Sequence, residues 1–231
     1  MPQRLVIIPT FNEIENIERI IRSVFSQKYE FHILVVDDNS PDGTASLVSS
    51  LKEEFEGRLF LEIRKTKSGL GTAYIHGFKW ALERDYGFIF EMDADFSHNP
   101  DDLIRLYNAC VNDKADVAIG SRYVTGVNVV NWPMKRVLMS YMASKYVKAI
   151  TRMPIQDTTA GFVCYRREVL ERINLDSIQF VGYAFQIEMK YKAYLLKFKI
   201  VEVPVIFTDR TLGESKLSSN IISEAVFGVI K

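Results

Sequence analysis

The chain has 231 residues, of which 48% are hydrophobic and 25% are charged, so its composition excludes a disordered chain and allows a sizeable core without disulfide or metal support. Lys plus Arg and Asp plus Glu each number 29, and this balance gives no support for nucleic acid as a partner.

Strand-like and helix-like segments alternate over the first 121 residues. Short apolar runs predict strands at 4–8, 33–36, 59–63, 88–92 and 117–119. Helical spacing and helix-start signals predict helices at 14–27, from Ser40 as N-cap followed by Pro41, at 71–83, and at 100–111 after Asn99 as N-cap. Repeated strand–helix units predict an α/β fold whose mostly parallel sheet is flanked by helices.

The remaining segments are less regular. They predict helices at 134–150, 183–196 and 218–230, and a strand at 200–207. Because no Pro/Gly-rich linker or internal repeat interrupts the chain, we expect a single domain over residues 1–231.

Polar residues follow four of the predicted strands, at 9–13, 37–40, 93–95 and 121–122. Ligands of such sheets bind outside the carboxyl ends of the strands, so these residues are predicted to converge on one site. Asp93 and Asp95 are the strongest candidates. In an extended segment both carboxylates point to the same side, where they are predicted to bind Mg²⁺ or Mn²⁺ together with phosphate oxygens.

Asp37 and Asp38 end the second predicted strand and leave two interpretations open. The string VVDD also suits a phosphate-accepting receiver domain, but such domains are about half this length and place the acidic pair near the chain start. Asp38 at a strand end is also suited to accept hydrogen bonds from a nucleobase or ribose, which is the role we favour.

Charge is distributed unevenly. Six acidic residues and no Lys or Arg lie between Asp85 and Asp102, with both ends counted, whereas the 40 residues between Asp116 and Asp157 contain no acid and six Lys or Arg. This asymmetry indicates a bound cation beside an anionic ligand. In the loop DRTLGESKL, Arg210 and Lys216 are suited to hold a diphosphate. Gly69 and Gly71 are weaker candidates for a turn that approaches a phosphate.

The sequence resembles the inverting family-two glycosyltransferases with the GT-A fold, and within them the polyprenyl-phosphate (dolichyl-phosphate) β-mannosyltransferases. The resemblance rests on strings that cover nearly the whole chain in order: PTFNEIENI, VVDDNSPDGT, GLGTAYIHGF, MDADFSHNP, GSRY, QDTTAGFVCYRREVL, GYAFQIEMKYKA and DRTLGESKL. It implies transfer of mannose from GDP-mannose to a polyprenyl phosphate with inversion.

The resemblance also implies residue roles. Asp93, Asp95 and Ser97 would lie at the metal. The donor would contact Pro9, Phe11, Glu13, Val36, Asp38, Asp93, Ala94, Asp95, Arg122, Arg210 and Lys216, with Phe11 replacing the Tyr more common in the family. Arg122, Arg136 and Ser140 would bind the acceptor phosphate. Because that phosphate is already anionic, no strong general base is needed, and Glu188 is expected to be structural or to position the substrate.

Two features predict association with a membrane. A helix at 134–150 would place apolar residues beside Lys135, Arg136, Lys145 and Lys148, as in helices that lie on anionic membranes. The apolar segment 221–230 would dock on the membrane surface or on a small membrane-anchoring partner. The opening apolar run is too short for a signal peptide, no stretch reaches the ~20 apolar residues of a membrane span, and Cys110 and Cys164 form no disulfide-like pattern. We therefore expect a cytoplasmic protein bound peripherally to the cytoplasmic face of a membrane.

Two alternatives remain open from the sequence. One is a polyprenyl-phosphate glycosyltransferase that uses UDP-glucose or another nucleotide sugar, because donor selectivity depends on few contacts. The other is a non-catalytic nucleotide-binding or signalling module built on VVDD. The two carboxylates Asp93 and Asp95 separate them, since only an enzyme needs both for turnover.

Overall fold

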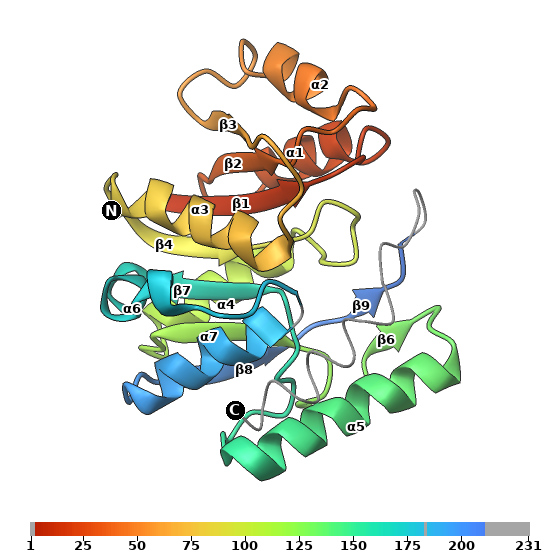
Figure 1. Cartoon of the computed structure of the whole chain (residues 1–231), viewed down its shortest axis with the longest axis vertical. Coiled ribbons are helices and arrows are strands. Elements are labelled where there is room, and N and C mark those ends of the chain that lie inside the picture. Colours follow the sequence, from red (N-terminus) through yellow and green to blue (C-terminus); the bar gives the residue numbers. More distant parts are fainter. Residues whose placement is uncertain (1–2, 183, 211–231) are drawn as a thin grey trace.

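A computed structural model describes residues 3–182 and 184–210, so the predictions for Tyr183, Lys216 and the helix at 218–230 lie outside the described residues. Its centre is a seven-stranded sheet with the order β3-β2-β1-β4-β7-β5-β8 (Figure 1). The strands are β1 (Gln3–Thr10), β2 (His32–Asp37), β3 (Leu59–Ile63), β4 (Tyr86–Glu91), β5 (Val117–Ser121), β7 (Val163–Arg166) and β8 (Ile200–Pro204).

The sheet is parallel except at β7, which runs antiparallel to its neighbours β4 and β5. The prediction of a mostly parallel sheet is therefore confirmed, and each of the five early strands is found at its expected place. β7 was not predicted, because its four residues, VCYR, show neither alternation nor a long apolar run.

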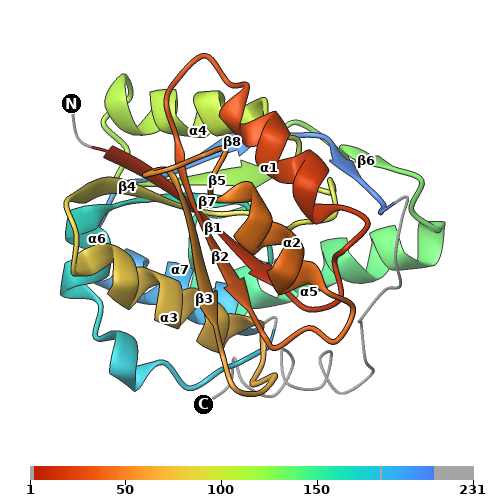
Figure 2. The same ribbon diagram turned by 90° about the horizontal axis from the view of Figure 1, so that it is seen from above.

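Helices cover both faces of the sheet (Figure 2). Two buried clusters, one on each face, form the core between sheet and helices. One face carries α1 (Ile17–Phe25), α2 (Thr44–Leu51) and α4 (Asp102–Val111). The other carries α3 (Leu70–Leu82), α6 (Arg167–Arg172) and α7 (Ala184–Leu195), with the short 3-10 helix η1 (Leu175–Ser177) between α6 and α7.

Two predicted helix starts are wrong. α2 begins at Thr44 after Gly43, not after Ser40, because Ser40 donates its backbone N–H and its Oγ–H to the carboxylate of Asp37, at 2.8 and 2.6 Å. α4 begins at Asp102, two residues later than predicted, although Asn99 Oδ1 accepts the N–H of Asp101 at 3.1 Å, as a capping side chain does, and so stabilises the turn that leads into the helix. In both cases a polar side chain stabilises the preceding loop.

The strand predicted at 200–207 is also interrupted. It leaves the sheet after Pro204 and re-forms as β9 (Phe207–Thr208), which pairs with β6 (Val129–Val130) in a separate two-stranded ladder. This departure carries Asp209 and Arg210 away from β8, beside the residues that follow β4.

The helix α5 (Met134–Thr151) lies away from the main sheet, at the bottom of Figure 1. Only Ser144 and Val147 of this helix are buried. Large apolar side chains are exposed along it, among them Met134 at 78%, Leu138 at 59% and Met142 at 57%. None of the helices within the described residues is long and apolar enough to cross a membrane. Cys110 and Cys164 are free thiols, buried with their Sγ atoms 3.7 Å apart.

Candidate active site

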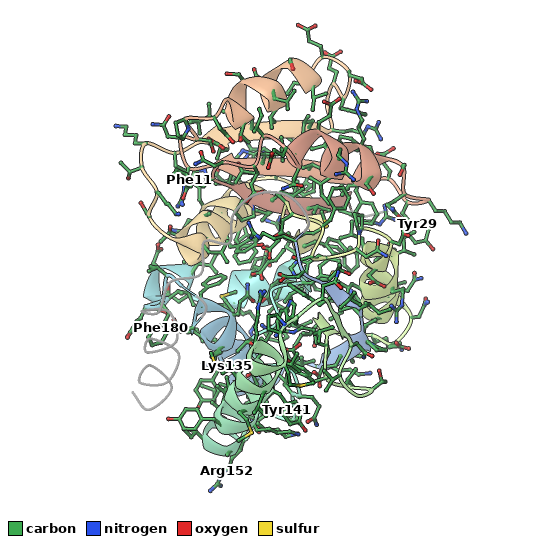
Figure 3. The ribbon with its side chains drawn as sticks, turned by 90° about the vertical axis from the view of Figure 1, so that its right-hand side faces the viewer. Phe11, Tyr29, Lys135, Tyr141, Arg152 and Phe180 are labelled. Carbon is green, nitrogen blue, oxygen red and sulfur yellow. The ribbon has the colours of Figure 1, made fainter. Side chains whose placement is uncertain are left out.

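The carboxyl ends of the parallel strands meet at one edge of the sheet, as the sequence predicts. Backbone hydrogen bonds join the segments that follow them: Asp38 N–H donates to Thr10 O at 3.0 Å, and Arg64 N–H donates to Asp37 O at 2.8 Å. Figure 3 shows Phe11, just after β1, on the opposite side of the molecule from Tyr29, which precedes β2. The site is built on this edge.

Asp93 and Asp95 follow β4, and the two carboxylates differ in environment. Asp95 is 7% exposed, and its carboxylate accepts the backbone N–H of Ser97 at 3.1 Å and pairs with Arg210, Nη2 to Oδ2, at 2.7 Å. Burial opposes its charge, but hydrogen bonds from Ser97 and the charge of Arg210 lower the pKa of Asp95 below its ordinary value.

The Asp93 side chain is 37% exposed but densely surrounded by protein. Burial and the negative charge of Asp95 raise the pKa of Asp93 to about 7. Tyr74 donates its hydroxyl to Asp93 Oδ1 at 3.4 Å. His98, stacked on Phe162, accepts the backbone N–H of Asp93 on Nδ1 at 3.1 Å, so its proton belongs on Nε2, 4.0 Å from Asp93 Oδ2.

This arrangement fits a divalent cation. Two carboxylates lie close enough for their charges to interact, and the buried Ser97 Oγ beside Asp95 makes no hydrogen bond of good geometry. Among residues 3–182 and 184–210 no group of three or more His, Cys, Asp or Glu side chains is arranged to hold a metal ion. One or two carboxylates are nevertheless the usual protein contribution where substrate phosphates complete the coordination of Mg²⁺.

Arg210 links two acidic residues at the site. Besides its contact with Asp95, its Nη1 lies 3.9 Å from Oε1 of Glu13, which is 7% exposed. Glu13 is fixed by Asn16, whose side-chain amide donates to its Oε2 at 3.1 Å. The structure thus brings Glu13, Asp95 and Arg210 together, whereas Lys216 lies outside the described residues.

Asp38 and Arg64 form a second ion pair, at the ends of β2 and β3. Arg64 reaches Asp38 Oδ1 with Nε at 2.6 Å and with Nη2 at 2.5 Å, and the two side chains are only 8% and 13% exposed. Phe11 follows β1 at the same edge of the sheet, and Lys67 Nζ lies 4.3 Å from the centroid of its ring. Sequence reasoning missed Arg64, although its place directly after a predicted strand was a signal that could have found it.

Two of the expected donor contacts, Val36 and Ala94, are constrained by burial. Val36 is fully buried in β2, and Ala94 is 4% exposed, so their side chains belong to the core. Pro9 lies in β1 beside Val36 in register. Asp37, also fully buried, accepts hydrogen bonds from Thr10 and Ser40, which gives it a structural task.

Arg122, after β5, is held by Asp157. Its Nε and Nη2 donate to the two Asp157 oxygens at 2.7 and 2.6 Å, and Nη2 also donates to Thr159 at 2.9 Å. Asp157 is completely buried, and Glu202 of β8 accepts its backbone N–H at 2.9 Å. This pairing, which no pattern in the sequence predicts, holds the guanidinium in one orientation.

Arg136, in the first turn of α5, lies beside Trp132 and Asp209. Its guanidinium carbon is 4.1 Å from the Trp132 ring centroid, and Nη1 donates to Asp209 Oδ1 at 2.8 Å. Ser140 lies one turn further along α5, near the hydroxyl of Tyr123. Asp209 and Arg210, adjacent in the chain, therefore contact the basic cluster and the carboxylate pair respectively.

The glycines after β3 are required by close packing. A Cβ at Gly71 would lie 2.8 Å from the Phe185 ring, and one at Gly69, whose φ is +99°, would meet Val181 at 2.9 Å. Glu188 is likewise occupied: its Oε2 accepts the backbone N–H groups of Gln179 and Phe180, at 2.9 and 3.1 Å.

Curated relatives match almost the whole chain. It is 48% identical over 225 residues to the polyprenol monophosphomannose synthase of Mycolicibacterium smegmatis, covering 97% of this chain and 84% of that protein. It is 44% identical over 227 residues to the undecaprenyl-phosphate mannosyltransferase of Micrococcus luteus, covering 98% of this chain and 92% of that protein.

Solved structures share the fold at low identity. A mannosyltransferase from Pyrobaculum calidifontis, in complex with GDP-Man and Mn²⁺, has a TM-score of 0.64 at 19% identity, over 93% of this chain; the chain spans 58% of that protein's length. A second structure is glucosyl-3-phosphoglycerate synthase from Mycobacterium tuberculosis in complex with Mn²⁺, UDP-glucose and phosphoglyceric acid. Its TM-score is 0.71 at 15% identity, over 99% of this chain and 78% of that protein.

The mostly parallel sheet and its strand-end carboxylates define an enzyme of the GT-A glycosyltransferase class. The family model for glycosyl transferase family 2 matches residues 5–173, and the chain belongs to that family. Membership excludes the receiver-domain interpretation of Asp37 and Asp38.

Proposed function

We propose that this enzyme transfers mannose from GDP-mannose to a polyprenyl (dolichyl) phosphate with inversion, giving a polyprenyl β-D-mannosyl phosphate. The observation that carries the proposal is the double contact of adjacent residues, Arg210 with Asp95 and Asp209 with Arg136. It links a carboxylate pair suited to a metal–diphosphate with a basic cluster suited to a second phosphate. The names of the two curated relatives support mannose and a polyprenyl acceptor.

On the donor side, Asp93 and Asp95 would hold Mg²⁺ or Mn²⁺, with Ser97 alongside. The bound cation would supply Lewis-acid stabilisation of the leaving diphosphate. Arg210, with Lys216, would bind the same diphosphate as its charge develops. Asp38, oriented by Arg64, would accept hydrogen bonds from the guanine, with Phe11 stacking near it and Pro9 and Glu13 completing the donor contacts. Val36 and Ala94, which are buried, would support this surface from the core.

On the acceptor side, Arg122, Arg136 and Ser140 would orient the lipid phosphate. A phosphate oxygen attacks the anomeric carbon while the bond from that carbon to GDP breaks, and GDP leaves with the electron pair. Because the attacking oxygen already carries negative charge, no residue has to remove a proton. The bonding of Glu188 to the backbone of 179–180 agrees with a non-basic role.

The acceptor requires contact with a membrane, and α5 offers the surface for it. Met134, Leu138 and Met142 are more than half exposed, and Ile150 is 40% exposed, while Lys135 and Lys148 lie on the same helix. Apolar side chains among basic ones favour binding to an anionic lipid interface. We propose peripheral association through this helix, with the segment 221–230 meeting the membrane or a small anchoring partner.

The test is a transfer assay with radiolabelled GDP-mannose or UDP-glucose, a short polyprenyl phosphate, and Mg²⁺ or Mn²⁺. We expect label in the lipid product with GDP-mannose only, and loss of turnover in Asp93→Ala and Asp95→Ala. Asp176→Asn is the matched control, because this acid is exposed and pairs with Lys79 outside the site. Preferred use of UDP-glucose would contradict the assignment of GDP-mannose as donor. Full turnover in both aspartate variants would contradict the placement of the active site at Asp93 and Asp95.

A further inference from the structure

The indole of Trp132 has a buried donor without a partner. Trp132 lies between β6 and α5, and among the described residues its Nε1 is shielded from solvent and makes no hydrogen bond. A buried polar group without a partner is costly to keep, and in native structures such a group needs a specific explanation. The missing partner of an N–H is an acceptor.

The surroundings of this indole indicate that the acceptor is an anion. The guanidinium carbon of Arg136 lies 4.1 Å from the Trp132 ring centroid, and that of Arg122 lies 5.5 Å from it. The ring also makes an edge-to-face contact with Phe207, with centroids 5.1 Å apart. Two cations beside the ring that carries the buried donor form an environment that favours an oxyanion with several acceptor atoms.

The acidic neighbour of this cluster sets a further condition. Asp209 pairs with Arg136 and lies next to Arg210 in the chain, so the Asp209 carboxylate already neutralises part of the positive charge of the cluster. An incoming anion must therefore either displace Asp209 from Arg136 or share Arg136 with it. A phosphate monoester, with up to two charges and three terminal oxygens, can contact both guanidinium groups and the indole together.

We propose that Trp132 is a binding residue for the acceptor, whose Nε1–H donates a hydrogen bond to the phosphate held by Arg122 and Arg136. This inference rests on the proposed function, because it assigns an acceptor phosphate to that basic cluster. It adds a neutral donor to two cations. Arg122, locked by Asp157, and Trp132 form the preset part of the subsite, while Arg136 exchanges Asp209 for the ligand.

The chain has two tryptophans, which allows a direct spectroscopic test. In Trp80→Phe, Trp132 is the sole indole, and Trp80 itself lies in α3 packed against Tyr86 and Phe60. We expect the emission of Trp132 to change saturably with a short-chain isoprenyl phosphate, and to remain unchanged with the corresponding isoprenyl alcohol or with GDP plus Mn²⁺. Inorganic phosphate should compete at higher concentration, which distinguishes the headgroup from the lipid chain.

The second arm measures affinity by calorimetry in Trp132→Phe, which keeps an aromatic ring beside Arg136 but removes the N–H. We expect the Kd for the isoprenyl phosphate to rise roughly tenfold relative to the unmodified protein, with the Kd for GDP–Mn²⁺ unchanged. Trp80→Phe is the matched control and should leave both constants unchanged. The emission measurement keeps the inference testable even if Trp132→Phe fails to fold.

Failure of this inference is distinguishable from failure of the proposed function. If the unmodified protein transfers mannose but Trp132 emission ignores isoprenyl phosphate, or if its Kd changes less than twofold in Trp132→Phe, the inference is overturned and the function stands. A response of Trp132 to GDP–Mn²⁺ alone also overturns it. If isoprenyl phosphate binds as expected but GDP-mannose is not used, the donor is wrong and the role of Trp132 is supported.

Discussion

The guanidinium of Arg210 lies on the carboxylate of Asp95, with Nη2 and Oδ2 2.7 Å apart, at the position where the proposed metal would bind. Arg210 and a bound cation would therefore compete for the same oxygen, and a diphosphate that binds Arg210 would relieve this competition. We expect Arg210→Ala to bind Mn²⁺ alone roughly tenfold more tightly, but to bind GDP in the presence of Mn²⁺ more weakly.

Titration of free Mn²⁺ by electron paramagnetic resonance measures the first effect, and calorimetry with GDP measures the second. Arg105→Ala is the control, since Arg105 pairs with Asp102 on α4. Weaker Mn²⁺ binding by Arg210→Ala in the absence of nucleotide would contradict the competition.

The pair of Arg122 and Asp157 should contribute strongly to stability. Their side chains are 9% and 0% exposed, so Asp157→Ala leaves a buried guanidinium without its main partner. We expect the free energy of unfolding to fall by about 3–5 kcal/mol, measured by urea denaturation. In the matched variant Glu54→Ala, the lost partner of Arg22 is half exposed, and we expect a much smaller change in the free energy of unfolding. Equal losses of stability in Asp157→Ala and Glu54→Ala would show that burial does not determine how much an ion pair contributes.

Gly71 is predicted to be required for the packing of α3 against α7. A Cβ at this position would lie 2.8 Å from the Phe185 ring, so we expect Gly71→Ala to destabilise the protein by about 1–3 kcal/mol despite the higher helix propensity of Ala. Adding Phe185→Leu removes the obstructing ring, and the double variant should lose less stability than the sum of the single ones. Additive losses in thermal or urea denaturation would be evidence against this contact.

His98 should make the fold sensitive to acid. Burial lowers the pKa of His98 to about 4, from its ordinary value of 6.5, so the folded state binds the proton less well than the unfolded state does. The resulting stability is fully present above pH 6.5 and is lost as the pH falls towards 4, by about 3 kcal/mol in all.

The check is the free energy of unfolding of the unmodified protein and of His98→Asn at several pH values between 7 and 4. The two curves should converge as the pH falls, because only the unmodified protein loses the contribution of His98. His76→Asn, at an exposed position on α3, serves as the control. Parallel curves for His98→Asn would refute the assignment.

Arg136 should separate acceptor from donor binding. We expect Arg136→Ala to raise the KM for polyprenyl phosphate roughly tenfold or more, because a charge-assisted hydrogen bond is lost, while the Kd for GDP–Mn²⁺ stays unchanged. Arg22→Ala, which removes an exposed arginine on α1, controls for the change in net charge. If the binding of polyprenyl phosphate and of GDP–Mn²⁺ weakened equally, a role of Arg136 confined to the acceptor would be contradicted.

The sequence alone determined the five early strands of the sheet and the edge that carries the site. Runs such as those of β1 and β4 are apolar because both faces of the strand are covered, and the polar residues that follow them must lie at the carboxyl ends. The sequence also predicted that Asp93 and Asp95 lie together, although β4 ends at Glu91 and both residues belong to the loop that follows it. These are local rules, in which each residue is interpreted from its near neighbours.

Only the tertiary structure decided which distant side chains meet. Arg64 pairs with Asp38, Asp157 locks Arg122, and Arg210 reaches Asp95 because the chain leaves the sheet after Pro204. The helix starts at Thr44 and Asp102 likewise depended on where Ser40 and Asn99 found their hydrogen bonds. Hydrophobic periodicity records which face of an element is buried, but an ion pair depends on the path of the chain between its partners, and that path is fixed by packing of the whole fold.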